Sequence, residues 1–266
     1  MMDETTALNG TTTKDQEWKQ KKGSTPLIVF ATLLFGLLLG LAFYVLLAAT
    51  TTAPSPQPQH TLQTGDLVFV SPRMDPRSPL DNAILTTGAA TIRWLRAQGV
   101  PVVGNQTADH VALVLRNDSG LFFVQALPPR VEVTAAIDFW QSRLPTTTVF
   151  HGWLTDPSRR SRLAAAAVQV ALGEVGKPYA QDFEPPPAEF YCSSLVNWAF
   201  RQAAGGVDVF VPPPLHFTLL FEPRVFWQTY YARLNLTLPV NVSGSNPTLL
   251  LHSSAVTFAE FLPPIY

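Results

Sequence analysis

Cysteine is nearly absent from this chain, since Cys192 is the only one among 266 residues. A single thiol excludes an internal disulfide framework and a zinc site built from several cysteines. Charge is also scarce: charged residues make up 14% of the chain, and the net charge is −1. Beyond the first 22 residues the sequence lacks a basic stretch long enough to line a nucleic-acid groove. We therefore expect no nucleic-acid partner.

Metal-ligand spacing is missing as well. None of the five histidines forms an H-x-H or H-E-x-x-H pair, so the sequence predicts no metal site and no cofactor. His60 falls in a Pro-rich stretch, whereas His151 and His216 have apolar neighbours and are expected to be structural. The 24 prolines are too many for a helical bundle, while a hydrophobic content of 47% suffices for a core.

One long apolar stretch is present. Residues 27–49 form 23 consecutive residues without a charged side chain, and a helix needs about 20 to cross a bilayer. A buried core helix is a weak alternative, because globular helices rarely stay apolar on every side for this length. A cleavable signal peptide is the stronger alternative, but its apolar region is about 7–15 residues long. We therefore predict an uncleaved transmembrane signal anchor.

The flanks of this stretch predict its orientation. Lys14, Lys19, Lys21 and Lys22 precede it, and the next charged side chain is that of Asp66. The positive-inside bias places the N-terminus in the cytosol and the rest in a lumen or outside the cell, as in a single-pass type II membrane protein. Four N-glycosylation sequons then lie on the far side. Their asparagines are Asn105, Asn117, Asn235 and Asn241.

The chain divides into four parts by composition. Residues 1–26 are polar and rich in threonine and lysine, which predicts a disordered cytosolic tail before the anchor. Residues 50–62 are a Pro-rich linker that should be extended and semi-rigid. Residues 63–266 have the texture of one globular domain.

The globular part mixes strand and helix signals, which predicts an α+β fold. Turn residues 117–120 join two apolar runs into a hairpin. The last 60 residues mix proline with aromatic side chains too irregularly for an assignment. Strands are expected at 65–70, 110–115, 121–126 and 146–154, and helices at 79–99, 159–176 and 192–204.

The last of these helices begins at the single cysteine. Cys192, Leu195, Val196 and Ala199 share one stripe, so a buried spectator thiol is one interpretation. The other is a nucleophile, because Cys192 follows the helix-breaking "EPPPAEF" and stands at a helix N-terminus. There the helix dipole and free N–H groups stabilise a thiolate, which should react readily with alkylating agents. An unpaired thiol in the predicted oxidising compartment also favours a functional role.

Strand parity connects a histidine to a polar partner. His110 begins an otherwise aliphatic strand, and a symmetric turn would pair Arg116 with Leu121. That register puts His110 and Gln125 on one face as diagonal neighbours. A neutral amide can orient an imidazole toward a thiol, as the third group of a cysteine hydrolase does. The alternative for Gln125 is a structural polar residue near a sheet edge.

Five short motifs follow one another in order: "TGDLVF", "ADHVALVL", "FFVQA", "ALGEVGKPYAQDF" and "FYCSSLV". Over residues 63–254 the chain resembles the YaeF/YiiX-like permuted papain-like amidases, relatives of the NlpC-type cell-wall peptidases and of lecithin:retinol acyltransferase. The resemblance implies a circularly permuted papain-like (NlpC-type) domain, here behind a single N-terminal transmembrane helix. It also implies that Cys192 is the nucleophile, His110 the base and Gln125 the third polar residue.

The expected activity is hydrolysis of amide or ester bonds in a small amide, peptide or lipid substrate. The backbone N–H of Cys192 is a candidate oxyanion donor because it opens a helix. Tyr179, Tyr191 and Asp66 are further candidates for contact with the substrate or the oxyanion.

Two other functions stay open. A lipid acyltransferase or thioesterase would use the same catalytic parts and would suit a membrane tether through residues 27–49. A catalytically degenerate binding module is favoured by two departures from the family pattern. Ser194 stands where the family usually has an acid, and Ala180 replaces the aspartate of the common "PYD".

Overall fold

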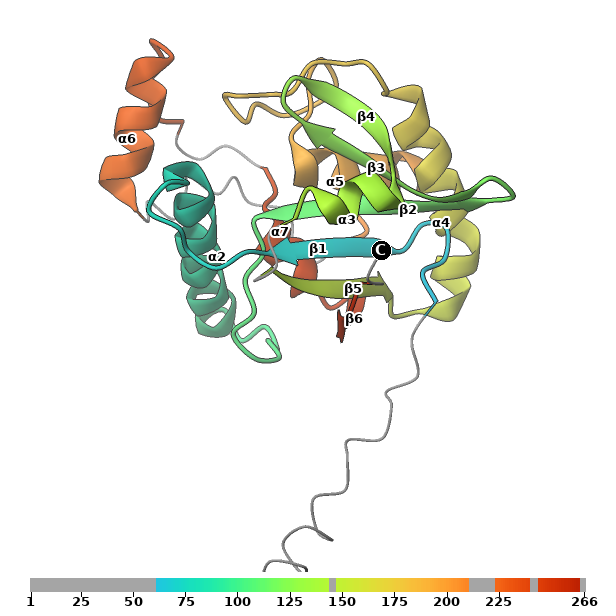
Figure 1. Ribbon diagram of the computed structural model, residues 1–266. Coiled ribbons are helices and arrows are strands. Elements are labelled where there is room, and N and C mark those ends of the chain that lie inside the picture. Colours follow the sequence, from blue (N-terminus) through green and yellow to red (C-terminus); the bar gives the residue numbers. More distant parts are fainter. Residues whose placement is uncertain (1–60, 144–146, 211–222, 240–243, 264–266) are drawn as a thin grey trace, which may run out of the picture. The chain divides into compact units, whose positions relative to one another are not determined.

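A six-stranded antiparallel sheet forms the centre of the domain (Figure 1), with strand order β4-β3-β2-β1-β5-β6. The computed structural model describes residues 61–143, 147–210, 223–239 and 244–263. The strands are β1 (Leu67–Ser71), β2 (His110–Asn117), β3 (Gly120–Leu127), β4 (Arg130–Ala135), β5 (Thr148–Leu154) and β6 (Val256–Phe261).

The helices begin where the sequence supplies suitable first turns. Proline occupies the first turn of α2, α4 and α7, where a missing N–H removes no helical hydrogen bond. The side chain of Asp156 caps α4 by accepting from the N–H groups of Ser158 and Arg159. The helices of the described residues are α2 (Pro79–Ala97), α3 (Ala136–Gln141), α4 (Pro157–Gly173), α5 (Cys192–Ala203), α6 (Arg224–Arg233) and α7 (Pro247–Leu251).

The predicted strands and helices are present with ends shifted by a few residues, and the mixture of helices with an antiparallel sheet confirms the α+β class. The sequence did not predict β4 and α3, which follow the hairpin directly. It also left α6, α7 and β6 unassigned, because these elements are short and lie among prolines and aromatic residues whose spacing has no clear period.

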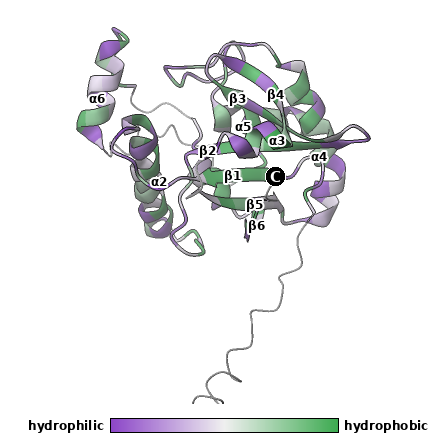
Figure 2. Ribbon diagram, viewed as in Figure 1, coloured by the Kyte–Doolittle hydropathy of each residue, from purple (hydrophilic) through white to green (hydrophobic). Residues whose placement is uncertain are grey.

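Both faces of the central strands are buried. Side chains alternate between the faces, so Val111 and Leu113 join the core beneath α4 and α5, while Ala112 and Val114 join a smaller core with Phe139 of α3. A strand covered on both sides consists of a continuous apolar run, as "HVALVL" does. Figure 2 shows the hydrophobic colouring of these strands against the mixed surfaces of α2 and α4.

The hairpin of β2 and β3 has the predicted register. Arg116 pairs with Leu121, and Asn117 pairs with Gly120 across the two-residue turn. Gly120 has φ +134°, a backbone conformation that favours glycine. Because this turn fixes the register, it also decides which side chains of β2 and β3 face the α3 side of the sheet.

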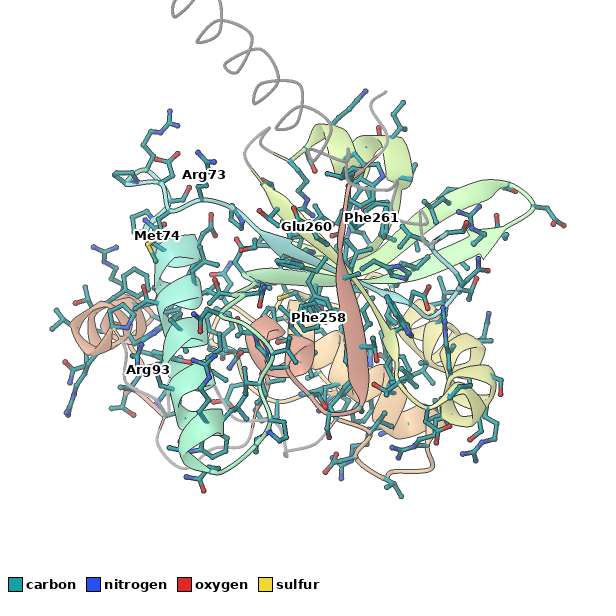
Figure 3. All side chains as sticks on the ribbon, turned by 90° about the horizontal axis from the view of Figure 1, so that it is seen from below. Arg73, Met74, Arg93, Phe258, Glu260 and Phe261 are labelled. Carbon is teal, nitrogen blue, oxygen red and sulfur yellow. The ribbon has the colours of Figure 1, made fainter. Side chains whose placement is uncertain are left out.

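The β6 strand ends the sheet and supplies one aromatic ring to each core (Figure 3). Phe258 packs against Phe150 with ring centroids 5.8 Å apart. Phe261 contacts Trp140, on the α3 side, with a centroid distance of 5.9 Å. A segment without a clear sequence pattern therefore holds both cores together at this edge.

The α2 and α6 helices lie beside one another (Figure 1). The indole Nε1 of Trp227 donates to Thr87 Oγ1 at 3.0 Å, and Ala83, Phe183 and Tyr191 share the same buried cluster with Trp227. This cluster supports the residue that immediately precedes the cysteine.

The predicted cytosolic tail, the predicted anchor at residues 27–49 and nearly all of the linker lie outside the described residues, as do His216 and Asn241. Within the described ranges, no helix is both long enough and apolar enough to cross a bilayer.

Candidate active site

The α5 helix presents Cys192 at its first position. Tyr191 is the N-cap, and Ser194 Oγ both accepts from the backbone N–H of Tyr191 and donates to its carbonyl, each at 2.9 Å. Ser194 therefore has a local task, which is to fix the turn that carries the cysteine. Cys192 itself is buried, with 7% of its surface exposed.

The sulfur of Cys192 lies against the start of β2. Its S–H donates to the backbone carbonyl of Asp109 at 3.9 Å. Burial raises the pKa of the thiol to about 12, although the nearby backbone N–H groups of Val111, Ser193 and Cys192 act in the opposite direction. Burial thus acts against the stabilisation of a thiolate that the sequence analysis expected from the helix terminus, and the expected reactivity with alkylating agents stays a prediction.

His110 and Gln125 are joined as the strand parity predicted. The imidazole Nε2 lies 2.8 Å from Gln125 Oε1, and both side chains are buried. Burial, together with the charge of Arg143, lowers the pKa of His110 to about 3, and the hydrogen bond to Gln125 acts against this shift. The imidazole is thus neutral across the physiological range and has one nitrogen able to accept a proton.

The Cys192 thiol contacts the backbone of the residue that precedes His110, and the structure shows no hydrogen bond between this thiol and the imidazole. Among the described residues, the S–H of Cys192 has Asp109 O as its acceptor, one residue before His110. Catalytic hydrogen bonds of free enzymes are often long or poorly aligned and tighten when the substrate binds. The geometry therefore brings Cys192 and His110 to the same end of β2.

Arg143 and Asp81 are charged residues near this pair that the sequence analysis did not identify. Arg143 follows α3, and its Nη2 lies 3.4 Å from Gln125 Oε1 while its guanidinium carbon lies 4.2 Å from the ring centroid of Phe139. Burial lowers the pKa of Arg143, and the charges of Asp109, Cys192 and Asp81 oppose that shift. No motif marks "QSRLP", so only the fold reveals that this cation lies at the site.

The carboxyl of Asp109 also lies near the thiol and near Arg143. Burial raises the pKa of its carboxyl to about 7, the charge of Asp81 adds to the shift, and Arg143 opposes it. Its Oδ1 is buried without a hydrogen-bond partner. A carboxyl in this condition changes protonation near neutral pH.

The two predicted tyrosines differ in their relation to the thiol. Tyr179 is partly buried, and its pKa is raised well above the usual value by burial first and by the charge of Cys192 second. Tyr191 is fully buried, and its hydroxyl accepts from the backbone N–H of Ser245 at 3.0 Å. Tyr179 thus remains a candidate substrate contact, whereas Tyr191 is held in the packing around α5.

Asp66 does not join the site. It lies at the opposite end of β1 from Val70, which pairs with His110. There Asp66 accepts from His151 Nε2 at 2.8 Å and from Arg160 at 2.6 Å. This pairing also corrects the prediction that His151 has only apolar neighbours, because a residue distant in sequence supplies its partner.

A pocket of about 320 Å³ lies along the other side of the first turn of α5. Tyr191 and Ser194 line it, together with Asn197, Trp198 and Arg201. It does not include Cys192, His110 or Gln125, so it is separate from the candidate catalytic pair.

Three of the four sequon asparagines lie at the surface. Asn105, Asn117 and Asn235 are exposed. Asn117 belongs to the hairpin turn, where its Oδ1 accepts from the N–H of Ser119.

Comparison with solved structures gives one informative likeness. The chain superimposes on the crystal structure of the protein described as metalloprotein yiiX from Escherichia coli O157:H7 with a TM-score of 0.51 and 17% sequence identity. The match covers 76% of this chain and 98% of that one, and it concerns the fold. Within the described part of this chain, His, Cys, Asp and Glu side chains form no group of three or more suited to hold a metal ion.

Comparison with protein families is more direct, although no curated protein matches the chain. The family of permuted papain-like amidase enzymes, described as YaeF/YiiX, C92 family, matches residues 61–258. That range contains the whole sheet except the end of β6, the helix that begins at Cys192, and the strand that begins at His110. This chain belongs to the YaeF/YiiX family of permuted papain-like amidases.

Proposed function

We propose that this protein is a cysteine hydrolase of amide or ester bonds in which Cys192 is the nucleophile, His110 the general base and Gln125 the group that orients the base. The observation that carries the proposal is the hydrogen bond of 2.8 Å between His110 Nε2 and Gln125 Oε1. It occurs beside a cysteine at the first position of a helix. These are the three roles of a cysteine-based acyl transfer.

The reaction starts from a neutral pair. Because burial holds the pKa of Cys192 near 12 and that of His110 near 3, the thiol keeps its proton until attack. As the sulfur adds to the substrate carbonyl, the proton passes from Sγ to Nδ1 of His110, since Nε2 is already used by Gln125. This transfer requires the thiol to turn from Asp109 O toward the imidazole.

The negative charge that develops on the substrate oxygen needs donors. The N–H groups of Cys192 and Ser193 open α5 and have no acceptor four residues earlier within the helix. Both approach the sulfur closely enough to lower its pKa. They are the candidate oxyanion donors.

The tetrahedral intermediate then collapses. The imidazolium returns its proton to the leaving amine or alcohol, and a thioester between Cys192 and the acyl group remains. Water then adds to this thioester while Nδ1 of His110 takes one of its protons. The intermediate breaks its C–S bond, the carboxylic acid is released, and the Cys192 sulfur recovers the proton from the imidazolium. Each step uses the same two atoms, Sγ and Nδ1, so one orientation of the imidazole serves both halves.

The proposal can be tested by looking for an acyl group on Cys192, because this is the only cysteine of the chain and a thioester can form only there. Full-length protein is mixed with p-nitrophenyl acetate and with p-nitrophenyl octanoate, and intact mass is followed together with release of p-nitrophenol. A hydroxylamine-sensitive acyl adduct that is absent from Cys192→Ala supports the proposal. An adduct that forms equally in Cys192→Ala, or no adduct with any acyl donor, contradicts it.

The same experiment separates the two other candidate functions. Faster release of the acyl group to an added lysophospholipid than to water would identify a lipid acyltransferase, and preference for thioesters would identify a thioesterase. Absence of any adduct would favour a binding module. Ser194, which raised that last possibility, is explained by its contacts with Tyr191 as a helix-capping residue.

We further propose that residues 27–49 anchor the domain in a membrane as a type II protein, with the domain on the lumenal or extracellular side. The supporting observations are the uncharged run of 23 residues and the lysines that precede it. The surface position of Asn105, Asn117 and Asn235 is compatible with glycosylation there. An N-glycosidase shift that is lost when these asparagines are changed to glutamine supports this orientation, and an unshifted protein contradicts it.

A further inference from the structure

The hydrogen bond to His110 is the first of a series that continues across two strands. Gln125 Nε2 donates to Thr134 Oγ1 at 2.8 Å, and Thr134 Oγ1 donates to Glu132 Oε1 at 2.9 Å. Gln125 lies directly opposite Glu132 in the ladder of β3 and β4, and Thr134 is two residues further along the same face. These three hydrogen bonds, which we call the relay, join the imidazole of His110 on β2 to the carboxylate of Glu132 on β4.

The Glu132 carboxylate determines which group donates in each hydrogen bond of the relay. A carboxylate accepts hydrogen bonds and donates none, so the single hydrogen of the Thr134 hydroxyl must go to Glu132. The hydroxyl oxygen is then an acceptor, and only the NH₂ group of Gln125 can donate to it. That fixes the amide with Oε1 toward His110, which in turn requires the hydrogen of the imidazole to be on Nε2.

A second contact fixes the amide from the other end. Arg143 Nη2 lies 3.4 Å from the same Oε1 atom of Gln125. A guanidinium has donors only, so it would oppose an amide turned with its NH₂ group toward His110. An acceptor on β4 and a donor after α3 thus favour the same orientation of Gln125.

We propose that Thr134 and Glu132 are positioning residues that set the tautomer of His110, keeping the proton on Nε2 and the lone pair on Nδ1. This inference rests on the proposed function, because it gives Nδ1 the capacity to receive the thiol proton. Neither residue touches the substrate or the sulfur. Their effect passes through the orientation of the Gln125 amide.

Three variants test the relay. Thr134→Val keeps the shape of the side chain and removes both hydrogen bonds, whereas Thr134→Ser restores the hydroxyl. Thr257→Val is the matched control, because Thr257 is also a strand threonine whose hydroxyl bonds to another side chain, that of Thr155. It lies on β6, outside the relay.

The direct readout is the tautomer of His110 in the full-length protein. Two-bond ¹H–¹⁵N correlation spectra at neutral pH distinguish a protonated from an unprotonated imidazole nitrogen, and His110→Asn identifies the signals. We expect a single Nε2–H tautomer in the wild type, in Thr134→Ser and in Thr257→Val. Thr134→Val should show a mixture of the two tautomers.

Turnover supplies the second readout. Thr134→Val should lower kcat roughly tenfold with little change in KM, because one net hydrogen bond has about this effect on an equilibrium. Thr134→Ser should recover most of this loss. If Thr134→Val does not fold, Glu132→Ala serves instead, since it removes the acceptor that orders the hydroxyl.

The outcomes separate the relay from the proposed function. A single Nε2–H tautomer with wild-type kcat in Thr134→Val, or in Glu132→Ala, overturns the relay while the hydrolase stands. A tautomer mixture in a protein that forms no acyl adduct overturns the hydrolase and keeps the relay. A tautomer change in the Thr257→Val control would show that the effect is not specific to the relay and would overturn the inference.

Discussion

His110 and His151 lie on the two strands that flank β1, and both are buried. Each places its Nε2 2.8 Å from a side-chain oxygen, that of Gln125 in one case and that of Asp66 in the other. Val70 pairs with His110 and Val68 pairs with His151, so both rings lie on the same face of the sheet. Burial, distance and face do not distinguish them.

The two centres differ in the charge of the partner and in what lies beyond it. Asp66 is a buried carboxylate that accepts hydrogen bonds from His151, Arg160 and the N–H of Gln63. None of these three donors is a nucleophile. Gln125 is neutral, and the histidine that it contacts follows Asp109, whose carbonyl accepts from Cys192. A histidine with a well-placed acceptor becomes a catalytic candidate only when a nucleophile is adjacent. The pair around His151 instead serves the fold.

Exchange of each histidine for alanine should reveal the largest difference between the two centres, which is their effect on turnover. His110→Ala should abolish turnover, since positioned acid–base groups contribute about 10²- to 10⁴-fold, and should leave the fold intact. His151→Ala should keep the activity of the folded protein. Turnover per folded molecule, with circular dichroism for folding, checks both, and equal loss in the two variants would remove the distinction.

The free energy of unfolding should fall more when the His151 centre is changed than when the His110 centre is changed. His151→Ala leaves the buried Asp66 carboxyl with one hydrogen-bond partner fewer, so the free energy of unfolding should fall by about 3 kcal/mol, the upper end of the cost of leaving a buried polar group unsatisfied. Gln125→Ala breaks a neutral hydrogen bond and should cost about 1 kcal/mol. Urea unfolding measures both. A larger loss in Gln125→Ala would mean that the His110 centre also has a mainly structural role.

Gln125 itself should matter for rate more than for stability. We expect Gln125→Ala to lower kcat about 10²-fold, the lower end of the contribution of acid–base groups. Gln125→Glu should be less damaging, because a carboxylate still accepts from His110 Nε2 and lies beside Arg143. Steady-state kinetics of the two variants gives the ratio. Full activity of Gln125→Ala would assign the orientation of His110 to another group.

The smallest expected effect concerns two aspartates, Asp109 and Asp66. Burial raises the pKa of Asp109 to about 7 in the folded protein, above the usual 3.8. The stability contributed by this group is therefore complete below about pH 4 and is lost as pH rises through 7. Asp109→Asn should match the wild type at pH 4 and raise Tm by a few degrees at pH 8.

Asp66→Asn is the matched control for that measurement. Asp66 accepts hydrogen bonds from Arg160 and His151, so its replacement should lower Tm at pH 8 instead of raising it. Thermal unfolding of both variants at the two pH values is sufficient. A lower Tm of Asp109→Asn at pH 8 would show that Arg143 stabilises the ionised carboxyl more than burial destabilises it.

Local patterns were enough for the parts of the site that depend on one hairpin. The turn at residues 117–120 fixes the register of β2 and β3, and the two-residue period then places Gln125 beside His110. The start of α5 could be predicted equally well, because the prolines before Cys192 prevent an earlier helix and an apolar stripe begins at Cys192. These relations need no information from distant segments.

The remaining parts could not be predicted, for separate reasons. Arg143 reaches the site from the end of α3, a helix that the sequence did not reveal. The partner of His151 lies 85 residues away in the chain. Thr134 and Glu132 are on β4, whose exposed and buried residues give a weak strand signal. Each contact depends on how elements pack, which a pattern within one element does not contain.

The sequence by itself determined the fold class and the placement of Gln125 beside His110, because periodicity, turns and helix starts are local properties. Only the tertiary structure decided the protonation of the thiol, the surroundings of Arg143 and Asp109, and the separate role of Asp66. The physical reason is that a pKa and a buried ion pair depend on hydration and on all charges nearby in space. Neighbours in sequence specify neither of these.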